Sequence, residues 1–253
     1  MNDTHTPKNL LRLLGHVEGW LSNHEALLLY HLAQKIPVSG DIVEIGSYKG
    51  KSTIALAEGM KHSSKHAVVW AIDPHEGVIK SDSGATHGAT FTAFQKNIKL
   101  AQLESFVQPL LSTSKKAAKN WKNPIRLLFL DGLHDFAHTH EDYQLWSGHV
   151  VKGGCIAFHD AFCGEEGVWK VINSYVFKRK DIVDIGTAGS ILYIFTGKPT
   201  VRSTLRVKRK KQFVRLAISM NRKKIPWVVK KVFIHTCIRF ILLTRYTRSI
   251  YTR

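Results

Sequence analysis

The chain has 253 residues, of which 44% are hydrophobic and 22% are charged. This length and balance are typical of a folded globular protein, and they exclude a mostly disordered or collagen-like chain. No uncharged apolar run is long enough for a simple transmembrane helix, and the first residues lack the apolar core of a signal peptide. The three cysteines have no CxxC spacing, which argues against a disulfide scaffold or a zinc ribbon. We therefore expect a cytoplasmic protein.

The charge is distributed unevenly along the chain. The formal net charge is +18, and residues 198–253 contain 17 Lys and Arg but no Asp or Glu. The net charge of residues 1–197 is therefore only +1. The sequence predicts a nearly neutral globular domain over residues 1–197, followed by a basic C-terminal extension over residues 198–253.

Helix-like and strand-like segments alternate along the first part of the chain. A helix begins at Ser22, where Ser22 and Glu25 have capping-box spacing, and ends near Pro37. A strand over 41–46, a helix over 51–60 and a strand over 67–73 come next. Further strands are predicted over 106–110, 125–130, 155–159, 182–185 and 191–195, and further helices over 91–101, 113–121, 138–149 and 165–177.

This alternation predicts an α/β fold with a doubly wound, mostly parallel, seven-stranded sheet that helices cover on both faces. Only the short segment 186–189 separates the last two strands. Strands joined so closely form a hairpin, so we expect an antiparallel strand at one edge of the sheet. In such sheets ligands bind at the carboxyl ends of the strands, and the candidate functional residues of this chain lie there.

The first strand ends in the segment Glu44-Ile45-Gly46-Ser47-Tyr48-Lys49-Gly50, which leads into a helix. Glycines let the backbone approach a ligand, and the first turn of a helix offers free N–H groups. The segment is not a P-loop, because only three residues separate Gly46 from Gly50. Asp73 ends the second strand, where a carboxylate can accept hydrogen bonds from both hydroxyls of a ribose. Together these features favour a nucleoside-binding site over a turn-capping role for Asp73.

Two further strand ends carry groups suited to catalysis or metal binding. The segment Asp131-Gly132-Leu133-His134 follows the fourth strand, and His159-Asp160 follows the fifth. The carboxylates of Asp131 and Asp160 are suitable ligands for a hard cation, and His159 either adds a nitrogen ligand or turns away. His134 is a candidate base, because an imidazole titrates near neutral pH. A structural or solvated role is the alternative for each histidine in a chain that has 14 of them.

These motifs together resemble a known family. Residues 17–196 resemble the class I S-adenosylmethionine-dependent methyltransferases, most closely the branch containing macrolide and aminocoumarin sugar O-methyltransferases and cephalosporin-hydroxylase-like proteins. The strings that carry the resemblance are GWLSNHEALLLYHLA, IVEIGSYKGKST, AIDPHEG, FTAFQKNI, LLFLDGLHDFAHTHEDYQLW and VKGGCIAFHD. Each string is loose, whereas their order and spacing are specific. The resemblance implies a Rossmann-like fold.

The resemblance also implies a role for each candidate residue. Those expected to bind S-adenosylmethionine are Glu44, Gly46, Ser47, Gly50, Asp73, Ser112 and Asp131. Those expected to hold a metal ion, with Mg²⁺ as the candidate, are Asp131, Asp160 and His159. Those expected to act in catalysis are Asp131 and His134, with His134 removing the proton from the acceptor hydroxyl. Metal-dependent members of the family tend to carry two adjacent acidic or amide ligands after the fifth strand, and this chain has His159 at the first of these positions.

Two segments have open interpretations. Residues 76–90 are rich in Gly, Ser, Thr and His and are predicted to form a loop, either a lid with Gly84 and Gly88 at its bends or a plain surface loop. In the extension, residues 227–246 have the pattern of an interfacial helix with Trp227 and Tyr246 as anchors. Contact with a membrane surface on the inner face of the membrane is the first hypothesis for the extension. Nucleic-acid binding and packing on the domain or on a second subunit are the alternatives.

The resulting hypothesis is an enzyme that transfers a methyl group from S-adenosylmethionine to a hydroxyl, on a sugar of a glycolipid or cell-surface polysaccharide. The alternatives are an RNA or other nucleic-acid methyltransferase that uses the basic extension, and a cofactor-binding scaffold without turnover. The absence of an aromatic–Asn–Pro motif around His159-Asp160 argues against methylation of a base nitrogen.

Overall fold

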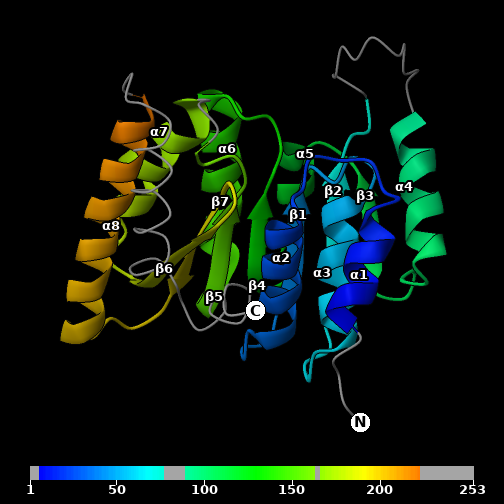
Figure 1. Cartoon of the computed structure of the whole chain (residues 1–253), viewed down its shortest axis with the longest axis horizontal. Helices are drawn as coiled ribbons and strands as arrows, with labels where there is room; N and C mark the ends of the chain where they lie inside the picture. Colours follow the sequence, from blue (N-terminus) through cyan, green and yellow to red (C-terminus); the bar gives the residue numbers. More distant parts are fainter. Residues whose placement is uncertain (1–5, 77–88, 163–165, 223–253) are drawn as a thin grey trace.

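A computed structural model of the chain describes residues 6–76, 89–162 and 166–222. Within these residues the fold has three layers, with a central sheet between two groups of helices (Figure 1). Helices and strands alternate as predicted, so the α/β class is confirmed. The predicted loop at 76–90 lies almost wholly outside the described residues, and so does the predicted interfacial helix at 227–246.

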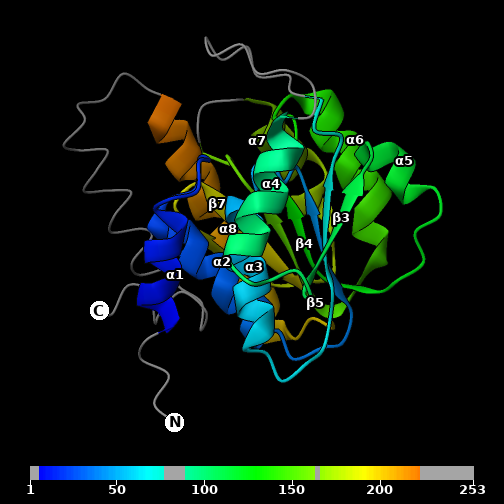
Figure 2. The same ribbon diagram turned by 90° about the vertical axis from the view of Figure 1, so that its right-hand side faces the viewer.

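The sheet has seven strands in the order β3-β2-β1-β4-β5-β7-β6. The strands are β1 (Asp41–Ile45), β2 (Val69–Asp73), β3 (Val107–Leu111), β4 (Ile125–Leu130), β5 (Val150–Phe158), β6 (Ile182–Ala188) and β7 (Ile191–Thr196). Strands β1 to β5 are mutually parallel, whereas β7 is antiparallel to both β5 and β6. The predicted mostly parallel sheet with an antiparallel member near one edge is confirmed, with β6 as the outermost strand on that side. Figure 2 shows β3 at the opposite edge.

Two apolar clusters, one on each face of the sheet, join the sheet to its helices. One cluster joins the sheet to α1 (Thr6–Leu14), α2 (Asn23–Lys35), α3 (Lys51–Lys61) and α4 (Ala89–Leu100). The other joins the opposite face to α5 (Ser114–Ala118), α6 (Phe136–Trp146), α7 (Glu166–Ser174) and α8 (Val201–Arg222). Helix α1 has no counterpart among the predicted elements, although the helical spacing of the buried Leu10, Leu14 and Val17 is visible in the sequence.

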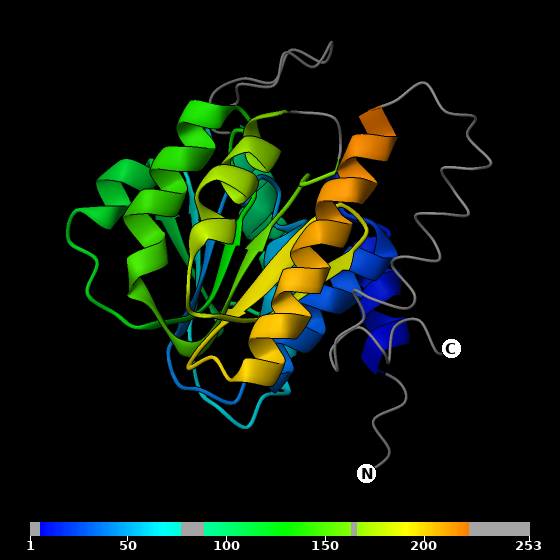
Figure 3. The ribbon, with the colours of Figure 1, turned by 90° about the vertical axis from the view of Figure 1, so that its left-hand side faces the viewer.

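Helix α8 is the described part of the predicted basic extension, and it packs against the sheet. Figure 3 shows this helix, in orange, along the yellow strands β6 and β7. Val207, Val214 and Ile218 are buried in the second apolar cluster. Lys210 is also buried, and its ammonium donates to Asp184 Oδ1 (2.8 Å) and to the carbonyl of Ile185 (2.7 Å). The first part of the extension is therefore continuous with the core of residues 1–197.

No helix among the described residues is long and apolar enough to cross a membrane.

The packing of α3 on α2 depends on a glycine in α3. A Cβ at Gly59 would collide with the carbonyl oxygen of Tyr30 and would lie 2.8 Å from the Cβ of Ala33. The two helices therefore approach each other closely at this point. Alanine normally favours a helix over glycine, so the steric clash and the helix propensity oppose each other here.

We expect Gly59→Ala to lower the free energy of unfolding by about 1–3 kcal/mol, because overpacking outweighs the gain in helix propensity. Urea denaturation measures this change. Gly148→Ala is the matched control, since no atom lies within 4 Å of a Cβ at that position. This control should change stability by no more than about 0.5 kcal/mol. Equal effects of the two substitutions would contradict the proposed close approach.

Candidate functional site

The site is built on the carboxyl ends of four adjacent parallel strands. Backbone hydrogen bonds continue past the strand ends, from Gly46 N to the Ile72 carbonyl (2.9 Å) and from Asp131 N to the Ile45 carbonyl (2.9 Å). His159 N likewise donates to the Leu130 carbonyl (3.0 Å). These bonds hold the residues that follow β1, β4 and β5 in register with one another. The topology therefore brings together residues that are far apart in the sequence.

Gly46 is required by this arrangement. Its φ is +87°, and a Cβ at this position would overlap the carbonyl oxygen of Asp131. Gly50 also has a φ of +87°, and a Cβ there would meet the ring of Phe94 at 3.1 Å. Gly46 thus lets the turn lie against the loop after β4, and Gly50 lets it lie against α4.

A cavity of about 480 Å³ opens at this edge of the sheet. One wall is the glycine turn, with Gly46 and Ser47, and another is formed by the segments that follow β4 and β5. The segment between α1 and α2 closes the third side with Glu18 and Trp20. Trp20 is 68% exposed and its ring lies 5.4 Å from that of Tyr48. The predicted residues that line the cavity are Gly46, Ser47, Asp131, His134, His159 and Asp160.

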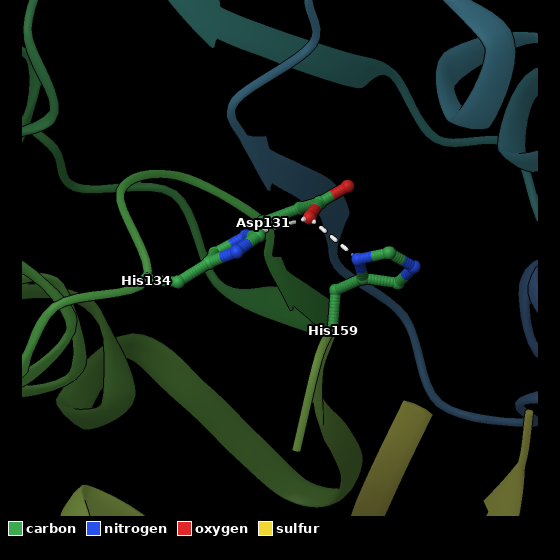
Figure 4. Close-up of side chains that lie close together, drawn as sticks. All are labelled: Asp131, His134 and His159. Atoms are coloured by element: carbon green, nitrogen blue, oxygen red, sulfur yellow. Dashed lines mark hydrogen bonds and ion pairs between the residues drawn. The ribbon is translucent and has the colours of Figure 1, made fainter. Parts of the chain in front are cut away.

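Two histidines and two aspartates form a cluster on the cavity wall. Asp131 lies between His134 and His159 (Figure 4). Its Oδ1 is 3.4 Å from Nε2 of His134 and 3.0 Å from Nδ1 of His159. Asp160 Oδ2 is 3.0 Å from Nδ1 of His134, and Asp160 Oδ1 is 3.5 Å from Nδ1 of His159. Each imidazole therefore faces both carboxylates.

The carboxylates favour the charged form of both imidazoles. Hydrogen bonds to Asp131 and Asp160 raise the pKa of His134 to about 9. Burial alone would lower the pKa of His159, but the neighbouring carboxylates of Asp131, Asp160 and Glu25 outweigh it and raise this pKa. These contacts therefore favour the cationic form of both rings, in which both ring nitrogens are protonated. The base role predicted for His134 requires a neutral ring, so one ring proton must be displaced before His134 can act as a base.

Glu25 is a site residue that the sequence did not reveal. It is buried, and its Oε1 lies 3.8 Å from Nε2 of His159 and accepts hydrogen bonds from Ser190 N (2.6 Å) and Ser190 Oγ (2.7 Å). Its Oε2 accepts from Ser22 N and Ser22 Oγ in the predicted capping box (2.7 Å each). A Cβ at Gly189 would overlap the Glu25 carboxylate, so the turn between β6 and β7 leaves room for it.

The same contacts explain the charge state of Glu25. Burial would raise the pKa of Glu25, but the nearby His159 ring and the hydrogen bonds from Ser22 and Ser190 outweigh it and lower this pKa to about 2. The capping box was visible in the sequence. The contacts to His159 and Ser190 were not, because those residues lie far along the chain and only the folded sheet brings them beside α2.

Asp73 connects the end of β2 to the glycine turn. Its Oδ2 accepts hydrogen bonds from Ser47 N (3.0 Å) and Tyr48 N (2.8 Å), and its Oδ1 accepts from His75 N (2.7 Å). Ser112 comes directly after β3, one residue beyond Leu111, which pairs with Asp73 in the sheet. The residues expected to bind the ribose and the adenine therefore lie on adjacent strand ends, next to the glycine turn.

Four residues expected to bind the cofactor do not line the cavity: Glu44, Gly50, Asp73 and Ser112.

Glu44 lies beneath the glycine turn. It is fully buried, and its Oε2 accepts a hydrogen bond from Thr53 Oγ1 (2.5 Å). Its Oε1 is buried without a hydrogen-bond partner among the described residues. Burial raises the pKa of Glu44 to about 8, with the Asp131 and Asp73 charges adding to the effect and hydrogen bonds from Ser52 and Thr53 opposing it. Glu44 therefore contacts the start of α3 through Thr53.

Comparison with known proteins identifies the fold. Residues 43–161 match a family model described as "Methyltransferase domain". The structure is similar to the O-methyltransferase NovP, with 16% identity, 70% of this chain and 81% of that chain covered, and a TM-score of 0.55. It is also similar to an O-methyltransferase from Bacillus cereus in complex with SAH (17% identity, 78% and 93% covered, TM-score 0.55). The calicheamicin methyltransferase CalS11 gives comparable values (16% identity, 78% and 93% covered, TM-score 0.55).

Residues 43–161 therefore match a methyltransferase domain, and the fold is the Rossmann-like α/β fold of the O-methyltransferase structures. The match over residues 43–161 is consistent with the methyltransferase family predicted from the sequence motifs.

The cluster fits Mg²⁺ poorly. Mg²⁺ requires near-octahedral oxygen ligands, whereas the atoms that converge here are one carboxylate oxygen of Asp131 and one ring nitrogen each of His134 and His159. These three atoms lie within 4.8 Å of one another. Asp160 was expected to be a ligand, and its Oδ2 faces the outer nitrogen of His134, while its Oδ1 lies 3.5 Å from Nδ1 of His159. The donor set is that of a cation that accepts nitrogen ligands.

The raised pKa of Glu44 makes stability depend on pH. Between the unfolded pKa near 4.5 and the folded pKa near 8, the folded chain binds more protons, so stability falls as pH rises. We expect Glu44→Gln to remove this fall, whose steepest slope is about 1.4 kcal/mol per pH unit. Urea denaturation of both proteins from pH 5 to pH 9 measures the difference.

Gln keeps an acceptor for Thr53 and removes only the titration. A stability difference between wild type and Glu44→Gln that is constant across this pH range would show that Glu44 is not buried as a neutral acid. Glu25→Gln is the contrasting variant. Because the pKa of Glu25 is low in the folded chain, its contribution to stability is present above about pH 4.5 and is lost only as the pH falls toward 2.

Proposed function

We propose that this methyltransferase transfers the methyl group of S-adenosylmethionine to a hydroxyl of a sugar. The observation that carries the proposal is the cavity that joins the glycine turn to the cluster of Asp131, His134, His159 and Asp160. One end of this cavity offers the glycine turn to the methionine part of the cofactor, and the other offers groups that can bind and deprotonate a hydroxyl.

In this proposal the cofactor lies along the strand ends. Asp73 at the end of β2 and Ser112 after β3 are suited to the ribose and adenine, and Gly46 and Ser47 to the methionine part. Both oxygens of Asp73 already accept backbone hydrogen bonds, and each carboxylate oxygen can accept a second. Asp131 stands where the sulfonium end would meet the acceptor. The relative from Bacillus cereus was solved in complex with SAH, which supports this choice of cofactor.

Three features support a sugar hydroxyl as acceptor. The exposed ring of Trp20 and the ring of Tyr48 form an aromatic surface at the mouth of the cavity, which suits the apolar face of a sugar. Glu18 accepts a hydrogen bond from the Tyr48 hydroxyl (2.9 Å) beside it and can accept one from a sugar hydroxyl. CalS11, one of the structural relatives, is described as a TDP-rhamnose 3'-O-methyltransferase.

The chain's own residues act by position and by proton transfer. The transfer breaks the sulfur–methyl bond, forms an oxygen–methyl bond and releases the hydroxyl proton. Holding the hydroxyl in line with the methyl group supplies much of the rate gain. His134 and Asp131 stand at the reacting hydroxyl, and His134 takes up the released proton once its ring is neutral.

The proposal predicts that SAH binds to the purified protein and that a sugar acceptor is methylated. We expect His134→Ala to lower kcat about 10²–10⁴-fold, as for loss of a catalytic base, while SAH binding is retained. Asp73→Asn should weaken SAH binding about tenfold or more, because a charged acceptor is lost. Calorimetry measures binding, and transfer of labelled methyl groups to sugar nucleotides and lipid-linked saccharides measures turnover.

The controls are chosen for matched chemistry. His138 lies close to His134 in the chain but pairs with Asp135 on the exposed start of α6, so His138→Ala should leave turnover unchanged. Asp181 pairs with Arg179 away from the cavity, so Asp181→Asn should leave SAH binding unchanged. Absence of SAH binding would overturn the proposal. Binding with methyl transfer to RNA and not to sugars would favour the nucleic-acid alternative, and binding without any turnover would favour the scaffold.

We also propose that the outer face of α8 contacts an anionic membrane surface. Val201, Leu205 and Leu216 share this face and are 81%, 59% and 46% exposed. The exposed cations Lys208 and Arg209 flank them on either side of the helix. Apolar side chains bordered by cations are typical of a helix that lies in the headgroup layer. A membrane-held acceptor would then be presented near the enzyme.

We expect the double substitution Lys208→Gln, Arg209→Gln to weaken binding to anionic phosphatidylglycerol vesicles about 30-fold, since each of the two cations contributes about 1 kcal/mol near such a surface. Vesicle co-sedimentation of the full chain measures the partition. The control is Lys119→Gln, Lys122→Gln, which removes the same charge from positions near α5. Equal loss in both variants, or retention by RNA rather than by vesicles, would exclude α8 as the membrane contact.

A further inference from the structure

We propose that Asp131, His134 and His159 form a site for a divalent transition-metal ion that prefers nitrogen ligands, such as Zn²⁺ or Co²⁺, with Glu25 and Asp160 orienting the two imidazoles. The inference rests on the proposed function and deepens it by naming the metal class of that site, and it replaces the base role of His134 with that of a metal ligand. It differs from the predicted Mg²⁺ site in its ion, in making His134 a ligand and in moving Asp160 out of the ligand set.

The first argument is convergence. Oδ1 of Asp131 is the common neighbour of His134 Nε2 (3.4 Å) and His159 Nδ1 (3.0 Å), and the three atoms lie within 4.8 Å of one another. Two imidazoles and one carboxylate on one side of an ion leave its other positions open toward the cavity. An acceptor hydroxyl that enters the cavity can reach those positions.

The second argument is the state of His159. Its ring is only 4% exposed, and neither ring nitrogen makes a hydrogen bond of good geometry among the described residues. Nδ1 faces Asp131, and the other nitrogen points away from it (Figure 4). A buried imidazole aimed into a polar cluster without a well-formed hydrogen bond is costly to maintain. A metal ion at Nδ1 would satisfy it.

The third argument is the surroundings of the two rings. Histidine ligands usually donate their second N–H to a carboxylate, which fixes the tautomer and the ring orientation. Here the outer nitrogen of each histidine faces a separate carboxylate. His134 Nδ1 lies 3.0 Å from Asp160 Oδ2, and His159 Nε2 lies 3.8 Å from Glu25 Oε1.

The Glu25 carboxylate and the backbone of Asp160 are held by the same residue. Asp160 adopts the left-handed region with φ +51°, and its N–H donates to Ser190 Oγ (3.3 Å). Ser190 also donates to the Glu25 carboxylate through its N–H and its hydroxyl. A non-glycine residue with positive φ is uncommon, and strain of this kind concentrates at functional sites.

The test is a titration of the metal-free full-length protein with Co²⁺, whose visible absorption reports its ligands. The titration is done without S-adenosylmethionine or acceptor, so its outcome is independent of the proposed methyl transfer. We expect one Co²⁺ per chain, displacement by Zn²⁺ and no displacement by a large excess of Mg²⁺. Displacement by Mg²⁺ at concentrations similar to those of Zn²⁺ would overturn the inference.

Variants then separate ligands from orienting residues. Asp131→Asn, His134→Ala and His159→Ala should abolish the Co²⁺ spectrum. Glu25→Gln and Asp160→Asn should retain it but weaken the affinity about 10–100-fold. The double variant Asp135→Asn, His138→Ala removes an exposed Asp–His pair next to the site, 2.6 Å apart, and should bind as wild type does.

Wild-type affinity and spectrum in His134→Ala would exclude His134 as a ligand and leave it as the base. Wild-type affinity in both Glu25→Gln and Asp160→Asn would overturn the orienting roles. Should Glu25→Gln fail to fold through loss of its capping contacts, Asp160→Asn still decides the question, because Asp160 takes no part in capping α2.

Discussion

The site depends on the close approach of two strand ends, where Gly46 after β1 meets the backbone of Asp131 after β4. No side chain fits between them, and a hydrogen bond from Asp131 N to Ile45 fixes the register. Because of this contact, the turn that is suited to the cofactor and the segment that carries Asp131 and His134 form one continuous wall. The cavity and the cluster of His and Asp residues lie along this wall, and Asp73 accepts hydrogen bonds from the glycine turn at Ser47 and Tyr48. A larger residue at position 46 would push the glycine turn away from the segment that carries Asp131 and His134.

Glu25 extends this wall beyond the consecutive strand ends. Its carboxylate joins the start of α2, the turn between β6 and β7, and the ring of His159. Strand β7 runs antiparallel to both of its neighbours, and the turn before it therefore brings Ser190 to the carboxyl ends of the parallel strands. The hairpin at the edge of the sheet thus has a role in the site as well as in the core.

Much of the fold was predictable because its signals are local. Apolar strands, the capping box at Ser22 and the glycine turn each lie within a few residues, and their alternation determined the α/β class. The strand-end rule then grouped Asp131, His134, His159 and Asp160 correctly. The sequence could not reveal that Oδ2 of Asp160 faces Nδ1 of His134, because this contact depends on the backbone conformation at Asp160. It also predicted a ligand contact for Glu44, whereas burial beneath Thr53 removes this side chain from the cavity.

Helix α8 changes how the division of the chain at residue 197 should be understood. The switch in composition at that position is sharp, yet Val207, Val214 and Ile218 complete the apolar cluster on one face of the sheet, and Lys210 neutralises Asp184. A protein cut at residue 197 would expose the apolar surface of β6 to water and leave that carboxylate without its buried ammonium. Loss of solubility in such a truncated protein would then report on the core rather than on any partner of the basic segment. A cut after Arg222 leaves this face covered.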